Sequence, residues 1–450
     1  MTIFNRDRLH QLKHREEQRF TADHPKSAEL YARAKHSLLG GVPMNWMKKW
    51  AGGFPVFVAH AKGAHFTDVD GREYVDLCLG DTGAMTGHSP HIVAEAVARR
   101  VRDGVTLMLP TEDAVWVGEE LKRRFGLPYW QFALTATDAN RFAIRIAREI
   151  RQRPKILVHH FCYHGTVDES FVSLRNGVVG ARRGNIGPPV NPAETTRVVE
   201  FNDLNALEDA LKHHDVGVLL AEPALTNVGI ILPDTGYWKA ARELTRKYGT
   251  LFIADETHTI CAGPGGCTKE WNLDPDFVVF GKPIGSGIPG STYGCTEEVA
   301  QRISARIELE DCDTGGIGGT LAGNALSLLA MRVTLENVLT AKAYETMIPL
   351  AKRFNEGVAS SIAKHGLPWN VIQLGARAEY HFTPKPPRSG TESAAAADFE
   401  LERFLHLYAL NRGVLLTPFH NMALMSPATT AADVDLHSRI FAEAASELTA

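Results

Sequence analysis

The stretch from Asp276 to Gly290, Asp-Phe-Val-Val-Phe-Gly-Lys-Pro-Ile-Gly-Ser-Gly-Ile-Pro-Gly, decides the fold that we expect for this chain. Its apolar run predicts a buried strand, which ends at Lys282 and a glycine-rich turn. A second run, Thr250-Leu-Phe-Ile-Ala-Asp, predicts another strand that ends in Asp255. Because ligands bind at the carboxyl ends of the strands in open α/β sheets, we expect both side chains at one functional edge.

A lysine and an aspartate at the ends of two such strands suit pyridoxal 5'-phosphate. The lysine can hold the aldehyde of this cofactor as a Schiff base, and the carboxylate can keep its pyridine nitrogen protonated so that the ring accepts electrons. Either residue alone is more often a solvated charge at a strand end. The interpretation of Lys282 and Asp255 as a catalytic pair therefore depends on the residues around them.

The bulk properties are those of an ordinary globular protein, with 450 residues, 44% hydrophobic and 22% charged. The net charge of −4 gives no electrostatic reason to expect nucleic acid or a membrane as partner. Neither a signal sequence nor a membrane-spanning stretch is predicted, so we expect a cytoplasmic protein. The six cysteines lack CxxC spacing, and the pairs His159-His160 and His213-His214 are adjacent rather than at i, i+4, so we expect neither a disulfide framework nor a metal site.

Strands and helices alternate along the middle of the chain, which predicts an α/β fold with a mainly parallel sheet. Further apolar strands are expected at 155–160 and 216–222, and helices at 90–102, 113–125, 138–153, 204–214, 235–248 and after Gly323. The strands are apolar throughout, as in sheets covered on both faces.

We expect a large domain over residues 81–335 and a smaller α+β domain formed by the two ends of the chain. Residues 1–80 supply a helical, charged segment (5–38) and short strands to the small domain, and 336–450 supply the rest. The segment Arg388–Ala397 is expected to be a mobile surface loop because it combines small and polar residues.

Three further motifs lie at predicted junctions between strands, loops and helices. Thr135-Ala136-Thr137 precedes the helix 138–153, either as a simple cap or as a cup for a phosphate at the positive end of the helix. Tyr163-His164 follows the strand 155–160, and its aromatic ring either stacks on a flat ligand or fills the core. Thr320 lies in a glycine-rich turn that precedes another helix. This turn is either a simple helix N-terminus or a second contact with the phosphate.

Taken in chain order, these features resemble the class III, fold-type I family of pyridoxal-phosphate-dependent aminotransferases. The resemblance is strongest to the branch that is similar to glutamate-1-semialdehyde aminomutase and β-amino-acid aminotransferases, and it covers residues from about 30 to about 445. It implies that Lys282 forms the Schiff base, that Asp255 binds the pyridine nitrogen and that Tyr163 stacks on the ring.

The same resemblance implies a set of cofactor-binding residues and a homodimer. The set comprises Thr135, Ala136, Thr137, Tyr163, His164, Glu222, Asn227, Asp255, Thr257, Lys282 and Thr320. In this family, the threonine that matches Thr320 reaches the phosphate of the neighbouring subunit, which implies shared active sites.

The chain departs from the family pattern at the cofactor site. The cup has Ala136 where the family has glycine, and Thr257 stands where the family usually has valine, followed by His258. The extra hydroxyl of Thr257 needs a hydrogen-bond partner, such as the ring oxygen of the cofactor or water.

The chain also lacks the expected anchors for a substrate carboxylate. Met47 stands where aminomutase relatives place an arginine, and the turn Pro418–Ser426 has none either. Trp46, Met47 and Trp50 indicate either an apolar or aromatic pocket or simple packing of a tryptophan-rich loop. Arg377 is the remaining candidate anchor, with a structural ion pair to Glu379 or another acid as the alternative. Glutamate-1-semialdehyde isomerisation, which needs a firm grip on a carboxylate, is disfavoured on this ground.

The function that we predict from these residues is transfer of an amino group from an amino acid or amine donor to a keto acceptor. The alternative is an aminomutase, racemase or epimerase on the same fold, because one lysine can return a proton to either of two carbons or faces. A non-catalytic pyridoxal-phosphate-binding or assembly protein is a third possibility, against which the presence of both Lys282 and Asp255 argues.

Overall fold

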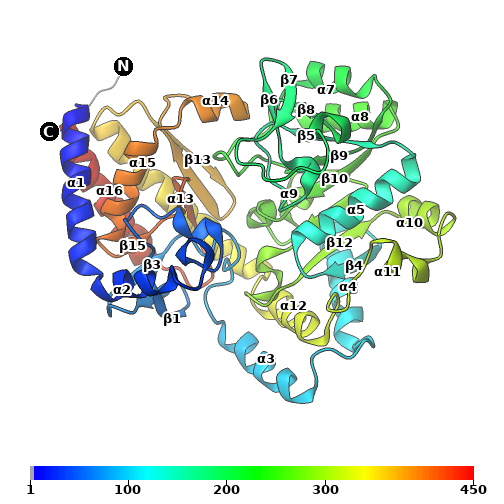
Figure 1. Cartoon of the computed structure of the whole chain (residues 1–450), viewed down its shortest axis with the longest axis horizontal. Helices are drawn as coiled ribbons and strands as arrows, with labels where there is room; N and C mark the ends of the chain where they lie inside the picture. The colour runs from blue at the N-terminus through cyan, green and yellow to red at the C-terminus, as the bar shows by residue number, and fades with distance from the viewer. Residues whose placement is uncertain (1–4) are drawn as a thin grey trace. The chain divides into compact units, whose positions relative to one another are not determined.

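The computed structural model describes residues 5–450 and divides the chain into two compact units (Figure 1). The first unit combines the N-terminal part up to Pro90 with Glu345–Pro386 and Ala396–Ala450. The second unit comprises His91–Tyr344 and Pro387–Ala395. Both ends of the chain therefore belong to one unit, and most of the other unit is a continuous segment.

A seven-stranded sheet forms the centre of the second unit, in the order β4-β12-β11-β10-β9-β5-β8. Its strands are β4 (Tyr129–Ala133), β5 (Lys155–His159), β8 (Thr196–Val199), β9 (Val216–Ala221), β10 (Leu251–Asp255), β11 (Phe277–Phe280) and β12 (Ser291–Cys295). All neighbours from β8 to β11 pair in parallel, and β12 is antiparallel to both β11 and β4. This arrangement confirms the mainly parallel sheet predicted from the sequence.

Helices cover this sheet because each carries an apolar stripe that has to be buried. The helix α5 (Ala136–Arg151) contacts β4, β9, β10, β11 and β12, and α8 (Tyr237–Lys247) contacts β10 (Figure 1). The other elements of the unit are α3 (His91–Asp103), α4 (Glu112–Phe125), β6 (Val172–Arg175), β7 (Val178–Ala181), α6 (Pro192–Thr195), α7 (Leu204–Leu211), α9 (Gly266–Glu270), α10 (Glu297–Ser304), α11 (Cys312–Gly315), α12 (Ala325–Asn337) and α14 (Gly390–Ala395). All residues of β9, β10 and β11 are buried, which explains why their sequences do not alternate.

The prediction of a loop over Arg388–Ala397 was wrong, because Gly390–Ala395 form the helix α14. Ser389 Oγ accepts a hydrogen bond from the backbone N–H of Glu392, and the Glu392 carboxylate accepts one from the N–H of Arg388. The alanines that follow have the highest helix propensity. These two reciprocal contacts and the alanines outweigh the turn signal of Ser389-Gly390.

The first unit contains two small sheets and five long helices. One sheet has the order β1-β2-β3-β15, with β1 (Val58–Lys62), β2 (His65–Asp68), β3 (Glu73–Asp76) and β15 (Val414–Leu415). The other has the order β13-β14-β16, with β13 (Asn370–Leu374), β14 (Arg377–His381) and β16 (Met422–Leu424). The helices are α1 (Arg6–Asp23), α2 (Pro25–Ala34), α15 (Phe399–Leu410), α16 (Ala431–Thr449) and most of α13 (Ala341–Lys364).

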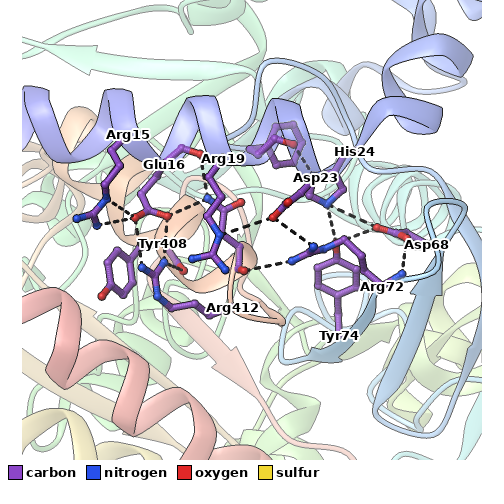
Figure 2. Close-up of polar contacts among 12 residues, drawn as sticks. Arg15, Glu16, Arg19, Asp23, His24, Asp68, Arg72, Tyr74, Tyr408 and Arg412 are labelled. Carbon is purple, nitrogen blue, oxygen red and sulfur yellow. Dashed lines mark hydrogen bonds and ion pairs between the residues drawn. The ribbon is translucent and has the colours of Figure 1, made fainter.

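A buried polar network fastens α1 to the rest of the first unit (Figure 2). The carboxylate of Glu16 accepts hydrogen bonds from Arg15 at 2.6 Å, from Asn411 at 2.9 Å and from Arg412 at 3.0 Å. Burial raises the pKa of Glu16, but these hydrogen bonds outweigh it and hold the pKa below its usual value. The charge of Glu16 is thus compensated by groups that come from the two ends of the chain.

Candidate active site

Two turns at the carboxyl ends of the strands pass close to the N-terminus of α5. Gly165, in the turn after β5, has φ +71°, and a Cβ there would lie 2.1 Å from the hydroxyl of Thr137. Gly281, after β11, would place a Cβ 3.2 Å from the Cβ of Ala136. Glycine is required at Gly165, and a side chain at Gly281 would be crowded, so the two turns and the start of α5 lie close together.

The carboxylate of Asp255 lies at the centre of a buried hydrogen-bond network. One of its oxygens accepts from His164 Nδ1 at 2.8 Å and from Asn140 Nδ2 at 2.9 Å, and the other accepts from the backbone N–H of Thr257 at 3.1 Å. Burial raises the pKa of Asp255, but the hydrogen bonds from His164, Thr257 and Asn140 reverse this effect and lower it. Asp255 is therefore held as an anion inside the protein.

His164 is the cationic partner of this anion. Burial lowers the pKa of His164, but the Cys162 thiol and the Asp255 carboxylate beside it raise the pKa above its usual value. Its Nε2 has no hydrogen-bond partner within residues 5–450. The pair therefore forms a buried ion pair that fixes the orientation of the Asp255 carboxylate.

Lys282 and His258 form a second contact. Lys282 Nζ lies 2.8 Å from Nε2 of His258, which is three residues beyond Asp255 in the chain and is 9% exposed. Lys282 has φ +36°, in the left-handed region that is uncommon for residues other than glycine. Strained conformations of this kind are concentrated at active sites. The turn after β11 thus presents the amine toward a histidine.

The loop after β9 is fastened to the turn that carries Tyr163. The backbone N–H of Tyr163 donates to Glu222 Oε1 at 3.1 Å, and the hydroxyl of Thr226 donates to the other oxygen of Glu222 at 2.5 Å. Burial raises the pKa of Glu222. Asn227 Nδ2 lies 3.5 Å from the carbonyl of Phe161. Tyr163 is 37% exposed, so the alternative in which its ring fills the core is wrong.

At the phosphate motif, the capping interpretation is confirmed for Thr135. Its hydroxyl accepts from the backbone N–H of Asp138 at 3.2 Å and donates to the Asp138 carboxylate at 2.8 Å. The hydroxyl of Thr137 accepts from the backbone N–H of Thr166 at 2.9 Å. Thr320 is exposed and lines a cavity of about 500 Å³ that Asp138 also lines. The contact of Thr320 with a neighbouring subunit stays a prediction.

The three predicted substrate residues belong to the first unit. Trp46 packs edge-on against Trp50, with ring centroids 5.3 Å apart, and with Met47 they line an apolar cavity of about 360 Å³. Arg377 is buried, donates to the Thr82 hydroxyl at 2.5 Å and lies 4.0 Å from the carboxylate of Asp81. Asp81 is thus an acid at ion-pair distance from Arg377. The roles of the three residues toward a substrate stay predictions.

The site contains two polar residues that the sequence did not indicate, Asn140 and His258. Asn140 follows Ala136 by four residues, so helical spacing could have placed it on the same face as the phosphate motif. His258 lies close to Asp255 in sequence, but no local pattern predicts its contact with Lys282. Both contacts depend on the pairing of strands that are distant in the chain.

Comparison with known proteins assigns the chain to a family. The sequence model of the family "Aminotransferase class-III" matches residues 46–443, and the chain belongs to this family. The glutamate-1-semialdehyde 2,1-aminomutase of Desulfitobacterium hafniense (strain DSM 10664 / DCB-2) is 31% identical over 425 residues, which cover 91% of this chain and 95% of that protein. The enzyme of the same name from Sorangium cellulosum (strain So ce56) is 32% identical, with 91% and 94% coverage.

Solved structures give the same result. A crystal structure described as a glutamate-1-semialdehyde-aminomutase from Pseudomonas aeruginosa PAO1 has a TM-score of 0.97 and 49% identity, covering 99% of this chain and 100% of that one. A lysine-to-alanine variant described under the same enzyme name was solved in complex with PMP. An omega-transaminase from Sphaerobacter thermophilus has a TM-score of 0.85 and 26% identity, with 94% and 98% coverage.

The chain is therefore a pyridoxal-phosphate-dependent class III enzyme with the fold-type I architecture, as the sequence predicted. Thr257 provides an observation of the site itself that fits the cofactor. Its hydroxyl is buried, next to Asp255, and has no hydrogen-bond partner within residues 5–450. A buried hydroxyl without a hydrogen-bond partner is expected beside a ligand that supplies an acceptor atom.

Two general features of the chain accompany this assignment. Of the helices in the described part of the chain, none combines the length and the apolar character needed to cross a membrane. Within residues 5–450, no three His, Cys, Asp or Glu side chains are grouped so that they could hold a metal ion.

Replacing Thr257 by valine tests the fit of the cofactor. We expect the cofactor-free T257V protein to gain about 1 kcal/mol in free energy of unfolding, because a buried hydroxyl without a partner is removed. We expect its Kd for pyridoxal phosphate to rise about fivefold, because the hydrogen bond from the hydroxyl to the cofactor is lost. Urea unfolding and titration with the cofactor measure the two effects.

The variant Thr257→Ser serves as the matched control, because it keeps the hydroxyl and the wild-type cofactor affinity. Equal cofactor affinity in T257V and wild type would show that this hydroxyl does not contact the cofactor.

Proposed function

We propose that this protein is an aminomutase, which moves an amino group between two carbons of one small amino carbonyl compound. The observation that carries the proposal is the 49% identity, over 99% of the chain, to the structure described as a glutamate-1-semialdehyde-aminomutase. Identity to the omega-transaminase is only 26%. These relatives favour the alternative of the sequence analysis over transfer between two different molecules.

The residues of the second unit supply what the cofactor needs. When bound, pyridoxal phosphate contributes an aldehyde that reacts with an amine and a ring that withdraws electrons from the carbon next to that amine. Lys282 supplies the amine from the turn after β11. Asp255, held as an anion by His164 and Asn140, would bind the protonated ring nitrogen. The N-terminus of α5, with the backbone N–H groups of Ala136 and Thr137, would bind the phosphate.

Lys282 also acts as the base of the reaction. Its Nζ would take a proton from the carbon that bears the amino group and would return a proton to the neighbouring carbon that receives this group. Nε2 of His258, 2.8 Å from Nζ, holds the amine in place and can accept a proton from it. His258 is thus the positioning residue for the Lys282 amine.

The second candidate is an aminotransferase, which the omega-transaminase neighbour favours. It uses the same lysine and aspartate, and it differs in requiring a separate keto acceptor. The site residues described above are compatible with both reactions, so the need for an acceptor distinguishes them.

The test is turnover of glutamate 1-semialdehyde by the purified, cofactor-loaded enzyme without any keto acid. We expect the isomer in which the amino group has moved between carbons 2 and 1, detected by NMR. Product formation only when an amino donor and a keto acid are both present would contradict the aminomutase and establish the aminotransferase.

Replacing His258 tests its proposed role as the partner of Lys282. We expect His258→Leu to lower kcat roughly 100-fold with little change in KM, because the proton acceptor beside Lys282 Nζ is lost. His258→Gln should retain more activity, since its amide oxygen can accept a hydrogen bond from the amine. Steady-state kinetics on the substrate that the enzyme turns over measure both variants; equal kcat values for the leucine and wild-type enzymes would refute this role.

A further inference from the structure

Ser291, the first residue of β12, carries a hydroxyl deep inside the second unit. The residue is fully buried, and its Oγ has no hydrogen-bond partner within residues 5–450. Ser291 pairs with Ala133 on β4, so it lies beside the short connection from β4 to α5. A buried polar atom without a partner needs an explanation, because its loss of water is not compensated.

The side chain of Ser291 faces α5. Alternate residues of a strand point to the same face of a sheet, so Ser291 and Tyr293 share one face and Thr292 belongs to the other. The ring of Tyr293 packs edge-on against the ring of Phe142 on α5, with centroids 6.1 Å apart. On the other face, the hydroxyl of Thr292 donates to the backbone carbonyl of Gln131 at 2.8 Å. The hydroxyl without a partner is therefore the one on the side of α5.

Gly281 leaves a small space between Ser291 and the start of α5. A Cβ at Gly281 would lie 3.0 Å from the Cβ of Ser291, 3.2 Å from the Cβ of Ala136 and 3.3 Å from the backbone nitrogen of Ala136. These three atoms therefore border the same space. The N–H of Ala136 belongs to the first turn of α5, where the N–H groups have no acceptor within the helix. Ser291 thus lies beside the helix end to which we assign the phosphate.

This helix end and the hydroxyl of Ser291 both suit an anion. The N-terminus of the 16-residue helix α5 supplies N–H donors and the positive end of the helix dipole. Within the phosphate motif, the hydroxyl of Thr135 already donates to the carboxylate of Asp138 at 2.8 Å. A hydroxyl from β12 therefore adds a donor that Thr135 does not supply.

We propose that the hydroxyl of Ser291 is a further ligand of the cofactor phosphate. It would donate a hydrogen bond to a phosphate oxygen, next to the N–H groups of Ala136 and Thr137. The inference rests on the part of the proposed function that assigns the phosphate to the N-terminus of α5. It explains why this hydroxyl is buried without a partner, and why glycine follows β11 directly, since a side chain at Gly281 would fill the space beside Ser291.

Comparing pyridoxal phosphate with pyridoxal, which lacks only the phosphate, tests this inference without any turnover. The loaded, full-length enzyme is dialysed against graded concentrations of either compound, and the bound fraction is measured from its absorbance. In Ser291→Ala we expect the Kd for pyridoxal phosphate to rise about 10- to 100-fold, because a hydrogen bond to a charged group is lost. The Kd for pyridoxal should stay at the wild-type value.

The matched control is Thr292→Val, which removes the neighbouring hydroxyl on the other face of β12. We expect T292V to lower the midpoint of urea unfolding, because the Gln131 carbonyl loses its donor, and to leave both Kd values unchanged. The S291A variant should not lower the unfolding midpoint of the cofactor-free protein, because the hydroxyl that it removes has no partner there.

Equal Kd values for pyridoxal phosphate in S291A and wild type would overturn the inference and leave an ordered water as the partner of this hydroxyl. A parallel rise in the Kd for pyridoxal would also overturn it, since the effect would not depend on the phosphate.

The variant Ala136→Pro separates failure of this inference from failure of the proposed phosphate site. Proline fits the first position of a helix but has no N–H to donate. Weaker binding of pyridoxal phosphate in A136P, with no effect of S291A, would retain the phosphate site and overturn only the role of Ser291. No effect in either variant would contradict both. Turnover of glutamate 1-semialdehyde without a keto acid remains the separate test of the aminomutase.

Discussion

The buried carboxylate of Asp255 is the constraint on which the site depends. An anion inside a protein is stable only when several donors replace the water that it has lost. Here the donors come from the turn after β5, from α5 and from the backbone beyond β10, through His164, Asn140 and Thr257. The hydrogen bonds to this carboxylate therefore fix three parts of the second unit relative to one another.

Close backbone packing complements that network. Gly165 and Gly281 bring the turns after β5 and β11 against the first turn of α5, where a side chain at Gly165 would collide with Thr137 and one at Gly281 would be crowded against Ala136. The positive end of α5 and the amine of Lys282 are thus both held at the carboxyl edge of the sheet. Because Lys282 follows β11 directly, its position depends on the same strand pairing as that of Asp255.

The parallel core of the fold and its principal site residues could be predicted from the sequence because they are local features. Uninterrupted apolar runs predicted β5, β9, β10 and β11, and two of these runs lead to the charged residues Asp255 and Lys282. The strands β4 and β12 were missed because Tyr-Trp-Gln-Phe-Ala and Ser-Thr-Tyr-Gly-Cys contain polar residues or glycine. The contacts Asn140–Asp255 and His258–Lys282 could not be predicted, since each depends on tertiary pairing rather than on spacing in the chain. The reaction could not be decided because one lysine serves both the transfer and the isomerisation, and the missing arginines argued against the reaction that the relatives favour.

The most direct measurement is to reduce the cofactor-loaded protein with borohydride and to locate the attached pyridoxyl group by peptide mass spectrometry. The account predicts that the group is attached to Lys282 alone, and that Lys282→Ala protein carries none. Attachment to a different lysine, or the absence of any attachment in the wild type, would contradict the central claim that the turn after β11 holds the cofactor.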